Sequence, residues 1–102
     1  MNRTRIDAQA WNDVTEIAEF LGVVRKNPEA ARKFIDEFER KASSYARQPE
    51  MGDIRDEIPG GLRSFTFRRW YIAVYRPLTD GIDVLRVFDG RRDYLRFLLE
   101  IP

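Results

Sequence analysis

The sequence contains no cysteine and no histidine. These absences exclude disulfides, Cys/His zinc sites, thiol nucleophiles and imidazole general bases. No apolar run approaches the roughly 20 residues that a membrane-spanning helix needs, and the first residues, MNRTRIDAQAW, lack the apolar segment of a signal peptide. We therefore expect a cytoplasmic protein that makes no membrane contact and uses no metal and no cofactor.

Lysine is also missing from the second part of the chain. All three lysines precede residue 61, whereas residues 61–102 carry eight arginines against five carboxylates. Arginine favours planar, bidentate contacts with phosphate or carboxylate groups. Arginines on strands also protect sheet edges and keep an open face hydrated. A binding surface and a merely solvated sheet are therefore both compatible with this bias.

Three runs rich in aromatic and β-branched residues predict consecutive antiparallel strands. They are Leu62–Phe67, Trp70–Arg76 and Ile82–Phe88. Arg68-Arg69 alone separates the first two, which predicts a tight hairpin, and Pro77 to Gly81 predicts a turn before the third. The middle run is apolar at both alternating sets of positions. Such a strand is either covered on both faces or keeps an aromatic face for a partner.

Two amphipathic helices are predicted before the strands. Apolar residues at helical spacing indicate a helix over Ala8–Leu21, with Asp7 as its N-cap and Gly22 as its stop. A second helix begins at Asn27-Pro28 and runs to about residue 47. Joined by a short loop, the two form an αα-hairpin that covers one face of the sheet.

Three further segments complete the single α+β domain that we expect over residues 1–102. Residues 3–6, RTRI, are compatible with an edge strand or with an unstructured start. Residues 48–60, rich in proline and glycine, predict a connecting loop. The apolar residues that follow Asp93 predict a short final helix or a docked tail.

Four motifs in order resemble the ParE branch of the RelE/ParE toxin superfamily. They are PEMG at residues 49–52, GLRSF at 61–65, WYIAVYRP at 70–77 and RVFDGRRD at 86–93. The resemblance extends from the first helix to Asp93. It implies an N-terminal α-helical hairpin packed on a small, curved antiparallel sheet. It also implies the toxin of a bacterial type II toxin–antitoxin module, of the kind that serves plasmid stabilisation.

The same resemblance implies two partners. ParE-type members poison DNA gyrase through protein–protein contact, whereas RelE-type members enter the ribosome and cleave mRNA. Both are neutralised by a cognate antitoxin whose C-terminal segment wraps the toxin, in a heterodimer or a heterotetramer. An acidic, amphipathic segment would suit the apolar middle strand and the arginines around it.

The chemistry of RNA cleavage decides between the two branches. Cleavage needs a base for the 2′-hydroxyl, an acid for the leaving oxygen and cations for the phosphorane. RelE-type members use lysines, arginines and a C-terminal tyrosine, but here Leu98 stands near the tyrosine position and Tyr94 lies one helical turn earlier. A gyrase inhibitor without catalysis is therefore favoured. The alternatives are a nuclease that uses Arg63, Arg92 and Tyr94, and an inactive homologue that serves as an interaction module.

The residues expected to contact the target or the antitoxin are arginines with two apolar anchors. For each of them a structural role remains open: Phe65 and Trp70 as core, and Arg86–Asp89 or Arg92–Asp93 as local ion pairs. No helix carries a clustered basic face, so direct DNA binding by this chain alone is not expected. The candidate binding residues are Arg63, Phe65, Arg68, Arg69, Trp70, Arg86, Arg91 and Arg92.

Overall fold

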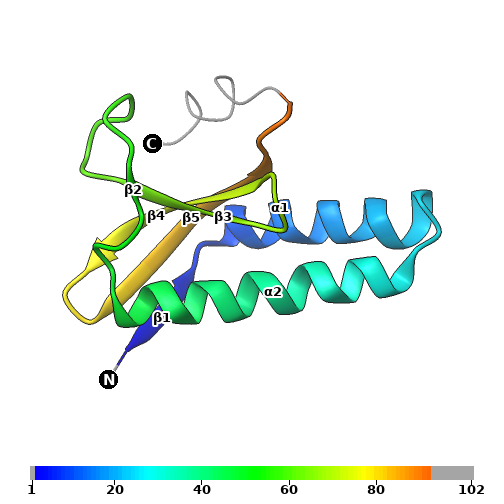
Figure 1. Cartoon of the computed structure of the whole chain (residues 1–102), viewed down its shortest axis with the longest axis horizontal. Coiled ribbons are helices and arrows are strands. Elements are labelled where there is room, and N and C mark those ends of the chain that lie inside the picture. The colour runs from blue at the N-terminus through cyan, green and yellow to red at the C-terminus, as the bar shows by residue number, and fades with distance from the viewer. Residues whose placement is uncertain (1, 93–102) are drawn as a thin grey trace.

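A computed structural model describes residues 2–92 as two helices packed against a five-stranded sheet (Figure 1). The strand order is β1-β5-β4-β3-β2. Strand β1 runs parallel to β5, and the other neighbouring strands are antiparallel, so the sheet is mixed. The elements are β1 (Arg3–Ile6), α1 (Ala8–Glu19), the π-helical turn η1 (Phe20–Val24), α2 (Pro28–Arg47), β2 (Asp53–Ile54), β3 (Arg63–Phe67), β4 (Tyr71–Leu78) and β5 (Gly81–Asp89).

Both helix starts are confirmed by their caps. The side chain of Asp7 accepts a hydrogen bond from the backbone N–H of Gln9, and that of Asn27 accepts one from Ala30. The predicted stop at Gly22 is wrong, because α1 continues into η1. Gly22 packs against α2, where an added Cβ would stand 3.5 Å from the Cβ of Ala31. Its small size therefore serves close helix packing rather than termination.

The three predicted strands are confirmed, and two features of the sheet correct the expectation. RTRI forms edge strand β1, so the helices follow a strand and their hairpin is not N-terminal. Because β1 pairs with β5 in parallel, the sheet is not purely antiparallel. The predicted loop over residues 48–60 also contains the short strand β2. The final helix or tail that the sequence predicts lies outside the described residues.

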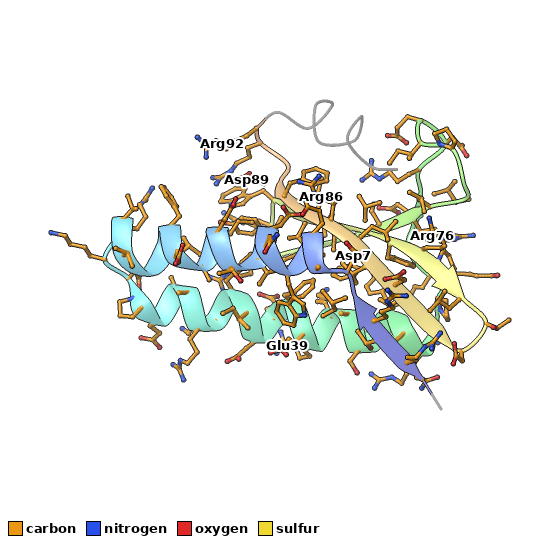
Figure 2. The ribbon with its side chains drawn as sticks, turned by 180° about the vertical axis from the view of Figure 1, so that it is seen from behind. Asp7, Glu39, Arg76, Arg86, Asp89 and Arg92 are labelled. Atoms are coloured by element: carbon orange, nitrogen blue, oxygen red, sulfur yellow. The ribbon has the colours of Figure 1, made fainter. Side chains whose placement is uncertain are left out.

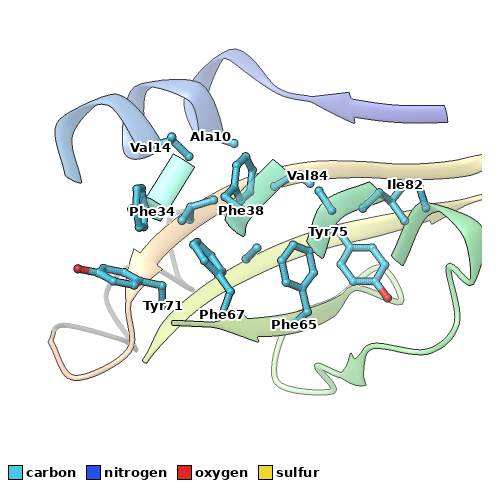
Figure 3. Close-up of a cluster of buried hydrophobic side chains, with 14 residues drawn as sticks. Ala10, Val14, Phe34, Phe38, Phe65, Phe67, Tyr71, Tyr75, Ile82 and Val84 are labelled. Carbon is cyan, nitrogen blue, oxygen red and sulfur yellow. The ribbon is translucent and has the colours of Figure 1, made fainter. Parts of the chain in front are cut away.

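The main core lies between the helices and one face of the sheet (Figure 3). Phe34 and Phe38 of α2 are fully buried and meet sheet aromatics. The Phe34 and Tyr71 rings lie 4.8 Å apart, centroid to centroid, and the Phe38 and Phe67 rings 5.6 Å apart. Aromatic pairs at such distances add stability beyond the area that they bury.

A second, smaller cluster covers the opposite face of the sheet. Ile58 and Leu62, from the segment before β3, pack with Val74 of β4 and with Leu85 and Phe88 of β5. Val74 is fully buried here, while its neighbours Ala73 and Tyr75 belong to the main core. The doubly apolar middle strand is therefore covered on both faces, which was the first of the two predicted alternatives.

The PEMG loop is held to the sheet by side chains of β3 and β4. The Tyr75 hydroxyl donates to the carbonyl of Pro49 (2.7 Å) and accepts from the N–H of Gly52 (3.0 Å). Arg63 donates to the carbonyls of Glu50 (2.8 Å) and Gly52 (3.0 Å). A Cβ at Gly52 would collide with the Tyr75 hydroxyl, so the contact requires glycine there. We call these contacts the Tyr75 latch.

Removing the Tyr75 hydroxyl is expected to lower the free energy of unfolding by about 1–3 kcal/mol, because the buried Gly52 N–H and the part-buried Pro49 carbonyl lose their partner. Urea unfolding of Tyr75→Phe measures this loss. Tyr45→Phe is the matched control, since no hydrogen bond of the Tyr45 hydroxyl is found in the described part of the chain. Equal losses in both variants would contradict the latch.

Candidate functional site

A groove of about 1050 Å³ opens where α1, η1 and α2 meet the β3–β4 turn and the end of β5. Its apolar lining includes Ile17, Phe20, Leu21, Trp70, Tyr71 and Phe88. Five arginines line it as well: Arg25, Arg68, Arg69, Arg91 and Arg92. The carboxylates along it are Asp13, Glu16, Glu37 and Asp89. Figure 2 labels Asp89 and Arg92 at the end of β5, beside α1.

The β3–β4 turn delivers three of these side chains to the groove. The predicted loop was Arg68-Arg69, but Phe67 pairs with Tyr71, so the loop also includes Trp70. Arg68 and Arg69 adopt left-handed conformations, with φ of 45° and 78°. Such conformations cost L-residues roughly 1–2 kcal/mol each. The turn thus carries local strain and points two adjacent arginines toward one groove.

Trp70 gathers arginines from two segments of the chain. The guanidinium carbon of Arg91 lies 4.1 Å from the ring centroid of Trp70, and that of Arg69 lies 5.6 Å from it. Both distances lie within the range of cation–π attraction. The indole therefore fixes the positions of two cations that the sequence separates by 22 positions.

Asp89 holds Arg91 in this place. The guanidinium donates to both carboxylate oxygens, at 3.0 Å (Nε to Oδ1) and 2.7 Å (Nη2 to Oδ2), and the Arg91 backbone N–H donates as well. The side-chain hydrogen bond from Arg91 lowers the pKa of Asp89 below its usual value, against the opposing effect of burial. Asp89 therefore stays ionised and keeps Arg91 against Trp70 across the neutral range.

This lowered pKa predicts a pH dependence. A carboxylate with a depressed pKa in the folded state contributes stability that is present above its unfolded pKa of about 3.9 and is lost as the pH falls through the folded value. The stability difference between the wild type and Arg91→Ala is therefore expected to shrink as the pH drops below about 4. Urea unfolding of both proteins at pH 6 and pH 3 measures this difference.

The control is Arg69→Gly, which leaves Asp89 and Arg91 paired. Its stability difference from the wild type should show no such change with pH. A constant difference for Arg91→Ala would contradict the assignment.

The groove holds more unpaired cations than unpaired anions. Arg68 lies 3.7 Å from Glu37, Arg91 is paired with Asp89, and Asp13 pairs with Arg86. Within residues 2–92, three arginines of the groove make no ion pair: Arg25, Arg69 and Arg92. Of the carboxylates that line the groove, Glu16 alone makes no ion pair within these residues. The groove is thus an apolar channel with an excess of positive charge.

Arg86 lies elsewhere than the sequence predicted. It was expected on the surface, but its exposed fraction is 6%, and it forms a buried bidentate pair with Asp13 of α1. The nitrogen–oxygen distances are 2.8 and 3.1 Å, and the N–H of Val87 donates to the same carboxylate (2.9 Å). Arg86 therefore ties α1 to β5.

Two other predicted binding residues make structural contacts and do not line the groove. Phe65 is buried and stacks on Tyr45 at 4.7 Å, in agreement with the open alternative that it is core. Arg63 belongs to the Tyr75 latch, at the end of β3 opposite the Arg68 turn, roughly 13 Å away along the strand. The groove brings together the remaining candidates, Arg68, Arg69, Trp70, Arg91 and Arg92.

The predicted nuclease set is not assembled in the described part of the chain. Arg92 lines the groove, Arg63 does not, and Tyr94 lies outside the described residues. Burial is the main cause that raises the pKa of Tyr71 and of Tyr75 above the ordinary tyrosine value. Both phenols therefore stay protonated at neutral pH, and neither is a base for a 2′-hydroxyl.

The sequence did not predict that residues of η1, and Arg25 directly after it, belong to the groove. Phe20, Leu21 and Arg25 line the groove, although the pattern assigned them only to the end of a helix and its loop. Phe20 is 43% exposed, and Val23 and Val24 beside it are more exposed still. The run FLGVVR, with apolar residues that one amphipathic face cannot all bury, was the available signal.

Residues 2–92 contain no group of three or more acidic, histidine or cysteine residues arranged to hold a metal ion. None of their helices combines the length and the apolar character that crossing a membrane requires.

Comparison with known proteins adds to this geometry. A family model described as the ParE toxin of the type II toxin–antitoxin system parDE matches residues 4–94. The chain belongs to the ParE toxin family. The match begins within β1 and continues through β5, so it includes the turn and the strand end that line the groove.

The fold is shared with a solved structure titled as the chromosomal ParDE toxin–antitoxin system from P. aeruginosa. The similarity covers 83% of this chain and 91% of that chain, with a TM-score of 0.66 and 24% sequence identity. At this identity the likeness shows the fold alone. No curated protein sequence matches the chain.

Proposed function

We propose that this ParE-family chain is the toxin of a cytoplasmic type II toxin–antitoxin pair, and that it inhibits DNA gyrase through protein–protein contact. The observation that carries the proposal is the groove, which has apolar walls and, within residues 2–92, three unpaired arginines against one unpaired carboxylate. Such a surface binds a partner rather than cutting a substrate. The inhibition therefore needs no catalytic group of the toxin.

The cognate antitoxin fits the same groove. An amphipathic segment would place its apolar side chains against Ile17, Phe20 and Leu21, and its carboxylates would meet Arg25, Arg69 and Arg92. Groove and segment are then complementary in both hydrophobicity and charge. The resulting complex is a toxin–antitoxin heterodimer, or a heterotetramer if the antitoxin dimerises.

The test is a gyrase supercoiling assay run beside a ribosome-programmed mRNA cleavage assay, with folded toxin free of antitoxin. We expect inhibited supercoiling, accumulated cleaved DNA and intact mRNA, and the antitoxin should restore supercoiling. Codon-phased mRNA cuts would replace this proposal with a ribonuclease. If neither supercoiling inhibition nor mRNA cleavage is observed, the chain is an inactive homologue.

A further inference from the structure

We propose that the groove binds a single strand of DNA at its arginine–tryptophan corner, which consists of Arg68, Arg69, Trp70, Arg91 and Arg92. The sequence favoured no direct DNA binding because no helix carries a basic face. The structure instead collects the cations from a turn and from a strand end. The choice of DNA as the strand rests on the proposed function, since gyrase acts on DNA.

The spacing of the cations suits neighbouring phosphates. Because Arg91 and Arg69 lie 4.1 and 5.6 Å from one ring centroid, their guanidinium carbons are at most about 10 Å apart. Phosphates follow one another along a nucleic-acid strand at about 3.4 Å of axial rise in a helix. This upper bound allows the two guanidinium groups to face neighbouring phosphates of one strand. Arginine is the side chain best suited to hold them, through bidentate contacts.

The cations that would contact phosphate are available. Arg69 and Arg92 make no ion pair within residues 2–92, and both are exposed. Arg91 is fixed by Asp89 and Trp70, so little side-chain entropy is lost when it meets an anion. The left-handed backbone at Arg68 and Arg69 is a strained arrangement of the kind that gathers at binding sites.

Aromatic rings line the groove beside these cations. Phe20, on η1, is 43% exposed, and Trp70, whose ring already carries Arg91 and Arg69, is 37% exposed. Unpaired bases stack on such rings whatever their sequence, and a basic groove lined with aromatic side chains is typical of sites for single strands. A duplex, whose bases are already stacked, would leave these rings unused. The antitoxin segment proposed above would use the same cations and rings, so it should compete with the strand for the groove.

The probe is a fluorescently labelled (dT)12 strand, followed by anisotropy with the purified toxin alone at low and moderate salt. We expect a dissociation constant of the order of 10⁻⁵ M at low salt and a weakening with salt that reports two or three phosphate contacts. The double variant Arg69→Gly/Arg92→Ala should bind about tenfold more weakly or worse. Glycine suits the left-handed position of Arg69, so this variant should fold. Phe20→Leu should also lose about tenfold, because one stacked base is lost.

The matched control is Arg47→Ala/Arg76→Ala, which removes the same charge from exposed positions outside the groove. It should change binding less than twofold. Equal weakening by the control would overturn the site, as would an absence of (dT)12 binding at low salt. Tighter binding of (rU)12 would overturn DNA as the ligand, and equal binding of an oligoglutamate of matched charge would overturn a nucleic-acid strand as the ligand. Inhibition of supercoiling is measured in a separate assay. A failure of DNA binding can therefore be told apart from a failure of the proposed gyrase inhibition.

Discussion

Replacing Asp13 with alanine is expected to lower the free energy of unfolding by about 3–5 kcal/mol. The carboxylate accepts two hydrogen bonds from Arg86 and one from the N–H of Val87, and Asp13 and Arg86 are 9% and 6% exposed. Truncation therefore removes the acceptor of three buried donors, two of which belong to the Arg86 cation. Equilibrium unfolding in urea at neutral pH measures the loss.

Two further variants make this result specific to the buried pair. Asp36→Ala removes a carboxylate from an exposed position of α2 and should cost less than about 0.5 kcal/mol. The double variant Asp13→Leu/Arg86→Met replaces both charges with apolar groups and should recover most of the loss. A loss below 1 kcal/mol in Asp13→Ala would contradict the view that this pair ties α1 to β5.

The second large effect concerns the partner. Phe20→Glu is expected to weaken binding of the cognate antitoxin about 100-fold, because it removes an apolar contact from the groove and adds a negative charge where an acidic segment is to bind. Titration calorimetry with the purified antitoxin measures the change. The side chain is 43% exposed, so the fold should tolerate the substitution.

Val23→Glu is the control for this experiment. Val23 belongs to the same π-helical turn and is 72% exposed, but it does not line the groove. The same charge placed there should change antitoxin affinity less than about threefold. If both variants weakened binding equally, the antitoxin would be contacting the tip of the helices rather than the groove.

Most of the secondary structure followed from local signals. The caps Asp7 and Asn27, with Pro28 after the second, marked both helix starts, and the three long strands showed the aromatic and β-branched pattern. The errors arose where tertiary contacts override local preference. Gly22 reads as a stop but packs against Ala31, and β1 pairs in parallel with a strand far along the chain.

The groove was only half predictable. The sequence predicted a binding surface of arginines with apolar anchors. The structure places five of those candidates along one groove: Arg68, Arg69, Trp70, Arg91 and Arg92. Sequence could not separate them from Arg86, because burial beside Asp13 depends on a contact across 73 positions. It also missed Phe20 and Arg25, which reach the groove only because α1 extends into a π-helical turn.

The most direct test of this account is the emission of Trp70 during titration with the antitoxin. The chain has two tryptophans, and Trp11 lies away from the groove, against Phe38. The variant Trp11→Phe therefore leaves Trp70 as the single reporter. The account predicts a saturable shift of Trp70 emission to shorter wavelength that reaches its end point at the stoichiometry found by calorimetry, because the segment displaces water from the indole. Tight binding with unchanged Trp70 emission would contradict the groove as the place where the partner docks.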